Sequence, residues 1–180
     1  MEKNNDIFRV ALIGPESTGK STLANGLAQY YKTVSTHEVA REYIAQLNRD
    51  YTLDDIINIS KQQVALEQNM LAKANRVLFC DTELIINKVW AEDVFKTCPD
   101  WIEANIKHNQ HDLYLLTSPD LPWEEDPVRE NPDRRAYLFE WYQKELKSIQ
   151  ATHVVISGEG DQRLENCIMA VDKFLKSVSK

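Results

Sequence analysis

The sequence predicts an α/β fold of three layers, in which a parallel five-stranded sheet is covered by helices on both faces. Short apolar runs alternate with longer segments of helical periodicity along the 180 residues, as expected when parallel strands are joined by helices. A glycine-bearing segment, residues 14–21, separates the first apolar run from the first helical segment. Ligands of such folds bind beyond the carboxyl ends of the strands, so the polar residues that follow each strand are the candidates for chemistry.

Each predicted strand is a short apolar run, and each predicted helix repeats apolar residues at helical spacing. The first helix carries Leu23, Leu27 and Tyr30 on one face. The second begins with two aspartates, which the helix dipole favours in a first turn. The strands are expected over residues 7–13, 33–38, 76–80, 113–117 and 153–156, the helices over 20–31, 53–74, 82–95, 133–149 and 162–179, and a long loop over 118–132.

Composition and organisation narrow the class of protein. No linker or repeat divides the chain, so we expect a single domain over residues 1–180. The formal net charge of -7 argues against a nucleic-acid partner, which needs a basic face. No apolar run reaches the roughly 18 residues that a membrane helix needs. Three widely spaced cysteines (Cys80, Cys98 and Cys167) suggest neither a metal site nor disulfides, which fits a reducing cytoplasm. We therefore expect a cytoplasmic protein without a membrane partner. The sequence does not fix its oligomeric state.

Residues 14–21 read Gly-Pro-Glu-Ser-Thr-Gly-Lys-Ser and match G-x-x-x-x-G-K-[ST] at every fixed position. The glycines let backbone N–H groups point at phosphate oxygens, and the helix N-terminus adds partial positive charge. Lys20 is placed to reach the terminal phosphates, and the Ser21 hydroxyl to bind Mg²⁺. The segment therefore predicts a P-loop enzyme that binds ATP and Mg²⁺ through Gly14, Glu16, Ser17, Thr18, Gly19, Lys20, Ser21 and Thr22.

Asp81 ends an apolar strand, a position at which P-loop proteins orient Mg²⁺. It is also a favoured residue for capping the helix that follows, and both roles are compatible. Glu38, Arg41 and Glu42 follow the second strand at i, i+3 and i+4, so a helix beginning there would place all three on one face. They are candidates for binding an acceptor hydroxyl, and the alternative is a solvated, salt-bridged helix face.

The loop over residues 118–132 is longer than an ordinary connection and resembles the lids of enzymes. Arg129, Arg134 and Arg135 are candidates for stabilising charge during phosphoryl transfer. The alternative is that they pair with the acidic residues of the same loop. Trp123 is expected either to stack on a planar substrate or to anchor the loop to the core.

Four blocks of the sequence together resemble the NadR-type ribosylnicotinamide kinase domain. They are residues 14–22, 38–43, 79–83 and 121–134, and they occur in the order of that family between residue 7 and about residue 157. The resemblance implies a P-loop kinase fold and ATP-dependent phosphorylation of nicotinamide riboside to nicotinamide mononucleotide, a step of NAD salvage. It favours functional roles for Glu38, Arg41, Glu42, Asp81 and Arg129.

NadR-type proteins usually carry an adenylyltransferase domain, and often a DNA-binding domain, ahead of the kinase, whereas this sequence begins at the kinase strand. We therefore expect neither of those activities from these residues. The expected catalytic residues are Lys20, Asp81, Arg129 and Arg134, with Ser21 and Asp81 at the metal and Glu38, Arg41, Glu42 and Trp123 at the nucleoside.

Three alternatives stay open at this point. The general base is Asp81 or one of the carboxylates Glu38 and Glu42. The acceptor is nicotinamide riboside or another small (deoxy)riboside. A protein of a different class, an ATP-binding switch without a small-molecule acceptor, would hydrolyse its nucleotide slowly on its own. An Asn-Lys-x-Asp motif for guanine is absent from the sequence, which argues against GTP.

Overall fold

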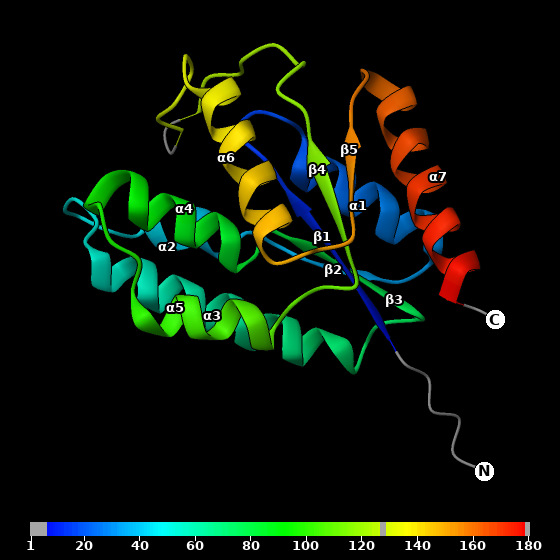
Figure 1. The fold of residues 1–180 in the computed structure, drawn as a ribbon, viewed down its shortest axis with the longest axis horizontal. Helices are drawn as coiled ribbons and strands as arrows, with labels where there is room; N and C mark the ends of the chain where they lie inside the picture. Colours follow the sequence, from blue (N-terminus) through cyan, green and yellow to red (C-terminus); the bar gives the residue numbers. More distant parts are fainter. Residues whose placement is uncertain (1–6, 127–128, 179–180) are drawn as a thin grey trace.

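The computed structural model describes residues 7–126 and 129–178, which form the three predicted layers (Figure 1). A single parallel sheet of the described residues has the strand order β2-β3-β1-β4-β5. The strands are β1 (Phe8–Ile13), β2 (Val34–Thr36), β3 (Val77–Asp81), β4 (Leu113–Thr117) and β5 (His153–Ile156). The helices are α1 (Lys20–Tyr31), α2 (Val39–Ala45), α3 (Leu53–Leu71), α4 (Leu84–Phe95), α5 (Asp100–His108), α6 (Arg135–Ser148) and α7 (Gly160–Val178). The predicted fold class is confirmed.

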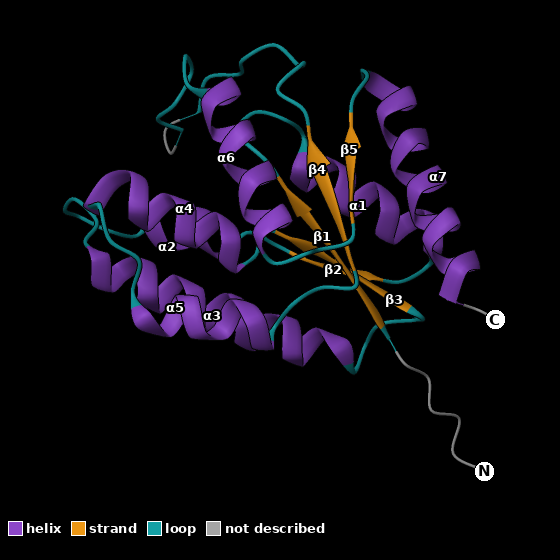
Figure 2. Cartoon of the chain, viewed as in Figure 1, coloured by secondary structure: helices purple, strands orange, loops and turns teal. Residues whose placement is uncertain are grey.

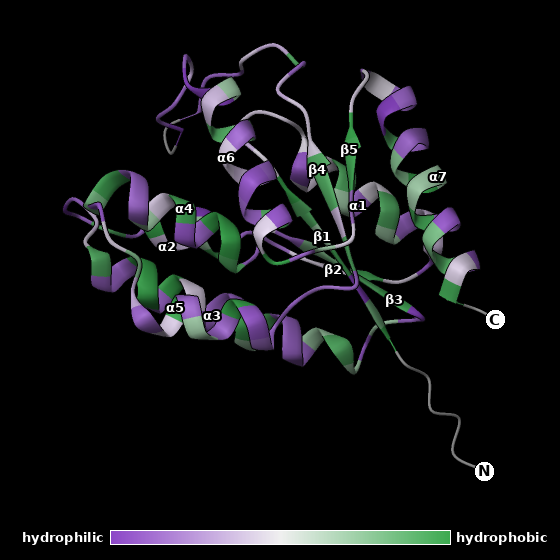
Figure 3. Ribbon diagram, viewed as in Figure 1, coloured by the Kyte–Doolittle hydropathy of each residue, from purple (hydrophilic) through white to green (hydrophobic). Residues whose placement is uncertain are grey.

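The two faces of the sheet are buried against different helices. Because side chains alternate along a strand, Val10 and Leu12 of β1 join an apolar cluster with α1 and α7, whereas Ala11 and Ile13 join a second cluster with α3, α4, α5 and α6. The same division of helices is visible in Figures 1 and 2. Figure 3 shows much of the sheet between them as hydrophobic. The central strands β1, β3 and β4 are covered on both faces and therefore read as nearly continuous apolar runs, whereas the edge strand β2 reads Val-Ser-Thr.

Two helices, α2 and α5, are absent from the predicted list, and the ends of α3, α4, α6 and α7 are shifted by a few residues. α5 was not predicted because it has only nine residues, of which Ile102 and Ile106 alone are buried. α2 begins directly after Glu38, which takes the N-cap position, so that β2 is shorter than predicted. The predicted end of the last helix, Ser179, lies outside the described residues. None of the described helices is long and apolar enough to cross a membrane.

The connections place polar segments together at one end of the sheet. All five strands are parallel, so the segments that follow β1, β2, β3, β4 and β5 emerge at the same edge. β1 lies in the middle, between β3 and β4. The segment after β1 is therefore flanked by the residues that end β3 and β4, and the candidate site is assembled there.

Candidate functional site

The segment between β1 and α1 is a phosphate loop held against the end of β4. Gly14 has a φ of 149°, and a Cβ atom at this position would lie 2.3 Å from the hydroxyl oxygen of Thr117. Only glycine permits this approach. The hydroxyl of Thr18 donates to the Pro15 carbonyl at 2.8 Å and lies 2.7 Å from the hydroxyl of Thr117. The side chain of Thr18 therefore fixes the shape of the loop from inside the protein.

Lys20 and Ser21 begin α1 and lie at the mouth of this loop. The ammonium group of Lys20 donates to the carbonyls of Gly14 at 3.0 Å and Pro15 at 2.8 Å, so it is held inside the curve of the loop. Ser17 and Gly19 have left-handed backbone angles, with φ of 57° and 80°, which produce the tight curvature. The loop thus concentrates N–H groups and a cation around one small volume.

Asp81 ends β3 and lies close to the hydroxyl of Ser21. Its side chain is buried, and its Oδ1 atom has no hydrogen-bond partner among the described residues. Burial raises the pKa of the Asp81 carboxyl, while the nearby Ser21 hydroxyl and Lys20 cation oppose that rise. A buried, unpartnered carboxylate oxygen next to a serine hydroxyl is a donor set that suits Mg²⁺, a hard cation that prefers oxygen ligands. The residues that the sequence assigns to the metal are therefore brought together.

Two cavities meet at the phosphate loop. The first, of about 410 Å³, is lined by the loop and by Arg129 and Arg163. The second, of about 420 Å³, is lined by aromatic and charged side chains that include Tyr51, Trp90 and Asp93. Residues common to both are Glu16, Lys20, Glu38 and Arg41. Another cavity, of about 450 Å³, is lined by Tyr31, Arg76 and neighbouring residues at the opposite end of the sheet, away from this chemistry.

Of the three residues that follow β2, two reach the cavities. Burial raises the pKa of the Glu38 carboxyl, and the nearby Lys20 cation counteracts this effect. Arg41 donates to Asp126 of the long loop at 2.7 Å. Glu42 instead is 68 % exposed and faces His37 at 3.8 Å, where both line a separate groove. The prediction that Glu38, Arg41 and Glu42 share one helix face is wrong for Glu38. Its backbone is extended at the N-cap of α2, so Glu38 is not part of the helix.

The long loop after β4 crosses over the phosphate loop; its residues 127–128 lie outside the described residues. Arg129 lines the first cavity and donates to the hydroxyl of Ser17 at 3.4 Å. Arg134 lines the second cavity and forms two hydrogen bonds with Asp93, of 2.8 and 2.7 Å. The two arginines that the sequence groups together are therefore divided between the cavities.

The side chain of Glu16 contacts this loop. Its carboxylate accepts hydrogen bonds from the backbone N–H groups of Glu130, at 3.2 Å, and Asn131, at 2.9 Å. Trp123 lines neither cavity, and its ring faces the guanidinium group of Arg135 at 5.8 Å. Arg135 in turn donates to the carbonyl of Leu121 at 2.8 Å. Of the two roles considered for Trp123, its contacts match that of an anchor for the loop.

Sequence reasoning missed several residues of the two cavities. In the second cavity, the Oδ1 atom of Asn87 and the hydroxyl of Thr82 are buried without partners among the described residues. Thr82 also has a strained φ of 74°, which is typical of functional positions. Asn87 is a buried polar residue in an apolar helical stretch, and this signal was available in the sequence. No motif marks the other four: Tyr51 precedes α3, Trp90 and Asp93 lie on α4, and Arg163 lies on α7.

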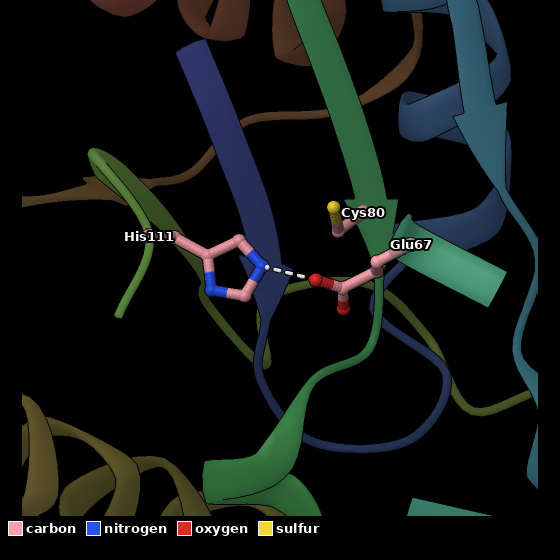
Figure 4. A group of neighbouring side chains, drawn as sticks. All are labelled: Glu67, Cys80 and His111. Carbon is pink, nitrogen blue, oxygen red and sulfur yellow. Dashed lines mark hydrogen bonds and ion pairs between the residues drawn. The ribbon is translucent and has the colours of Figure 1, made fainter. Parts of the chain in front are cut away.

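A polar cluster outside the site lies on the face of the sheet covered by α3, and consists of Glu67, Cys80 and His111 (Figure 4). Their donor atoms lie within 4.8 Å of one another, and zinc uses all three donor types. The carboxylate of Glu67 is already paired, because it lies 3.1 Å from His111 Nε2 and 3.9 Å from Arg9. Burial also raises the pKa of the Cys80 thiol, which opposes the thiolate that a metal needs. We therefore assign this cluster to the core.

Comparisons with known proteins find similarity to two NadR proteins. The trifunctional NAD biosynthesis/regulator protein NadR of Salmonella typhimurium (strain LT2) is 28 % identical over 176 residues, which are 92 % of this chain and 42 % of that protein. NadR of Escherichia coli (strain K12) is 30 % identical over 124 residues, which are 67 % of this chain and 30 % of that protein. The chain thus spans less than half the length of these curated relatives.

Solved structures share the fold. The crystal structure of a NadR protein in complex with NR has a TM-score of 0.76 and 23 % identity, and the match covers 93 % of this chain and 51 % of that one. The structure of a NadR protein in complex with NAD and AMP-PNP has a TM-score of 0.74 and 23 % identity. This match covers 93 % of this chain and 49 % of that one. The structure of deoxyadenosine kinase from M. mycoides has a TM-score of 0.64 and 12 % identity. This match covers 92 % of this chain and 100 % of that one.

The family comparison covers most of the chain. The model of a protein family described as an AAA domain matches residues 9–163, which extend from β1 into the first turn of α7. This match includes the phosphate loop, Asp81 and the long loop after β4. The resemblance to NadR-type P-loop domains expected from the sequence is confirmed, and the chain belongs to the AAA-domain family.

Proposed function

We propose that this protein is an ATP-dependent kinase that phosphorylates nicotinamide riboside to nicotinamide mononucleotide. The observation that carries the proposal is the meeting of two cavities at Lys20, Glu38 and Arg41. A phosphoryl-transfer enzyme needs one chamber for the donor and one for the acceptor, with cations where they join. The similarity to NadR proteins, one of which was crystallised with NR, supports this acceptor.

In the donor chamber, the phosphates of ATP take the place of the loop carbonyls as partners of Lys20. Arg129 approaches the same volume from the long loop. Ser21 and Asp81 would hold Mg²⁺, which would supply neutralisation of phosphate charge when bound. Rate enhancement then comes from positioned cations that stabilise the charge of the transferred group.

In the acceptor chamber, Tyr51, Trp90 and Tyr142 supply aromatic surface, and Asp93 and Glu130 supply carboxylates. This combination suits a planar ring that carries a positive charge, such as the pyridinium ring of nicotinamide riboside. Glu38 is our choice for the general base because it lines both chambers, which Asp81 does not. Its raised pKa improves its ability to accept the proton of the attacking hydroxyl.

The proposal is tested with a panel of acceptors in the presence of ATP and Mg²⁺, read by release of ADP. We expect nicotinamide riboside to be phosphorylated faster than thymidine, deoxycytidine or uridine. A deoxynucleoside that is clearly faster would show a kinase with a different acceptor. Slow ADP release that no acceptor accelerates would instead indicate the ATP-binding switch.

A further inference from the structure

The wall of the acceptor chamber is joined to the phosphate loop by a chain of hydrogen bonds. The indole N–H of Trp90 donates to the hydroxyl oxygen of Tyr51 at 3.1 Å. That hydroxyl donates to the carboxylate of Glu130 at 3.0 Å. The backbone N–H of Glu130 donates to the carboxylate of Glu16 at 3.2 Å. Each donor has an acceptor in the next element, so α4, the segment before α3, the long loop and the phosphate loop are connected in sequence.

Tyr51 is the member of this chain that lies between the rigid elements. It immediately precedes Thr52, which caps α3 together with Asp55, so its backbone is fixed by the start of a long helix. Its ring packs against that of Trp90 with 4.9 Å between centroids. Burial raises the pKa of the Tyr51 hydroxyl to about 12, and the hydroxyl therefore keeps the proton that it donates to Glu130.

The residue before Glu130 in the chain is Arg129, the arginine that reaches the phosphate loop. A change in the position of Glu130 is transmitted to Arg129 through a single peptide bond. Glu16 holds the same stretch from the other side, through the N–H groups of Glu130 and Asn131. The stretch formed by residues 129–131 is thus held between Tyr51, which lines the acceptor chamber, and Glu16, which lines both chambers.

We propose that Tyr51 is a positioning residue, whose hydroxyl holds Glu130 so that Arg129 is aligned on the donor phosphates when the acceptor chamber is filled. This inference rests on the proposed kinase function and adds to it a coupling between the two chambers. An acceptor packed against Trp90 and Tyr51 restricts both side chains and stabilises the hydrogen bond to Glu130. Acceptor and nucleotide therefore bind with positive cooperativity, because each pays part of the cost of ordering the same stretch.

The decisive variant is Tyr51→Phe, which removes the hydroxyl and keeps the ring against Trp90. The matched control is Tyr30→Phe on α1, where the side chain is 57 % exposed and outside both cavities. With nicotinamide riboside, ATP and Mg²⁺, we expect Tyr51→Phe to lower kcat by roughly tenfold while the KM for ATP changes little, since a lost hydrogen bond to a charged group has about this effect. An unchanged kcat would overturn the proposal.

A binding experiment measures the coupling itself. The Kd for AMP-PNP is determined with and without nicotinamide riboside. In the wild-type protein and Tyr30→Phe we expect the riboside to tighten AMP-PNP binding several-fold, and in Tyr51→Phe we expect no tightening. Glu130→Gln keeps a carbonyl oxygen that accepts from Tyr51 and should retain the coupling, whereas Glu130→Ala should lose it. Equal coupling in wild type and Tyr51→Phe would contradict the role of the hydroxyl.

Hydrogen exchange separates this inference from the identity of the acceptor. The backbone N–H groups of Glu130 and Asn131 should exchange faster in Tyr51→Phe than in wild type or Tyr30→Phe, both in the free protein and with AMP-PNP bound. If nicotinamide riboside is not a substrate of the wild type, the proposed function fails while this difference persists. Identical exchange in all three proteins would overturn the positioning role, whatever the acceptor.

Discussion

Lys20 shows how a single residue connects motif, local structure and chemistry. Its ammonium group donates to the carbonyls of Gly14 and Pro15, and Lys20 itself lines both cavities. Because water can replace the ammonium group at these carbonyls, the fold does not depend on Lys20. Its positive charge, in contrast, has no substitute once a phosphate group occupies the loop.

We predict that Lys20→Ala lowers kcat by about 100-fold or more, in the range expected for the loss of one stabilising charge at a transition state. The melting temperature without ligand should change by less than about 2 °C, because the side chain is solvent-accessible and apolar packing is unaffected. ADP release and thermal melting measure the two effects. Near-normal turnover in this variant would show that the nucleotide does not bind at this loop.

The residues of the site differ in how far the sequence could predict them. Lys20, Ser21 and Asp81 follow from short motifs because their geometry is set by a local turn or by a strand end. Arg129 and Arg134 were recognised as candidates, but only the fold shows that they reach different cavities. The second cavity is made by side chains from α2, α4, α6 and intervening segments, and no local pattern brings these together.

At the scale of elements, the start of α3 is fixed by a capping box and by further hydrogen bonds to Asp55. Asp55 accepts from Thr52 N–H at 2.7 Å, from the Tyr43 hydroxyl at 3.0 Å and from Arg49 at 2.6 Å. The Arg49 hydrogen bond and the Thr52 backbone hydrogen bond hold the pKa of the Asp55 carboxyl below its usual range. Asp55 therefore caps the N-terminus of α3 and also links α3 to α2 through Tyr43.

Because this pKa is lower in the folded than in the unfolded protein, the carboxylate stabilises the fold fully above about pH 4, the ordinary aspartate value. The contribution is lost as the pH falls toward the folded-state pKa. We predict that Asp55→Asn lowers stability at pH 7 and that the difference from wild type shrinks as the solution is acidified. Urea unfolding at several pH values tests this, with the exposed first-turn variant Asp54→Asn as control. A pH-independent difference would contradict the prediction.

The elements themselves were predictable where burial dominates. The strands β4 and β5 and the helix α1 begin and end at the predicted residues because apolar runs and the phosphate loop delimit them. The sequence could not reveal α5, since a nine-residue helix with two buried residues has too weak a periodicity. Its position depends on α3 and α4, against which it packs in the fold. Short elements of this kind are specified by tertiary contacts more than by their own pattern.

At the scale of the whole molecule, both cores are built on the same strands. Neighbouring residues such as Leu12 and Ile13 point to opposite faces, so the three central strands β1, β3 and β4 each contribute to both clusters. If these strands unfold, the apolar side chains on both faces of the sheet become exposed together. We therefore expect the described residues to behave as one folding unit, as the predicted single domain requires.

We predict that the two cores unfold together, and two buried cysteines provide matched probes. Cys80 lies in the cluster under α3–α6, and Cys167 in the cluster under α1 and α7. In increasing urea, both thiols should become reactive toward a thiol reagent with the same midpoint and the same slope, coincident with the loss of helical circular dichroism. Cys98 is only partly buried and should react earlier, as a reference for local opening. If Cys167 became reactive at clearly lower urea than Cys80, α1 and α7 would form a separately unfolding layer, and the description of the chain as one domain would be wrong.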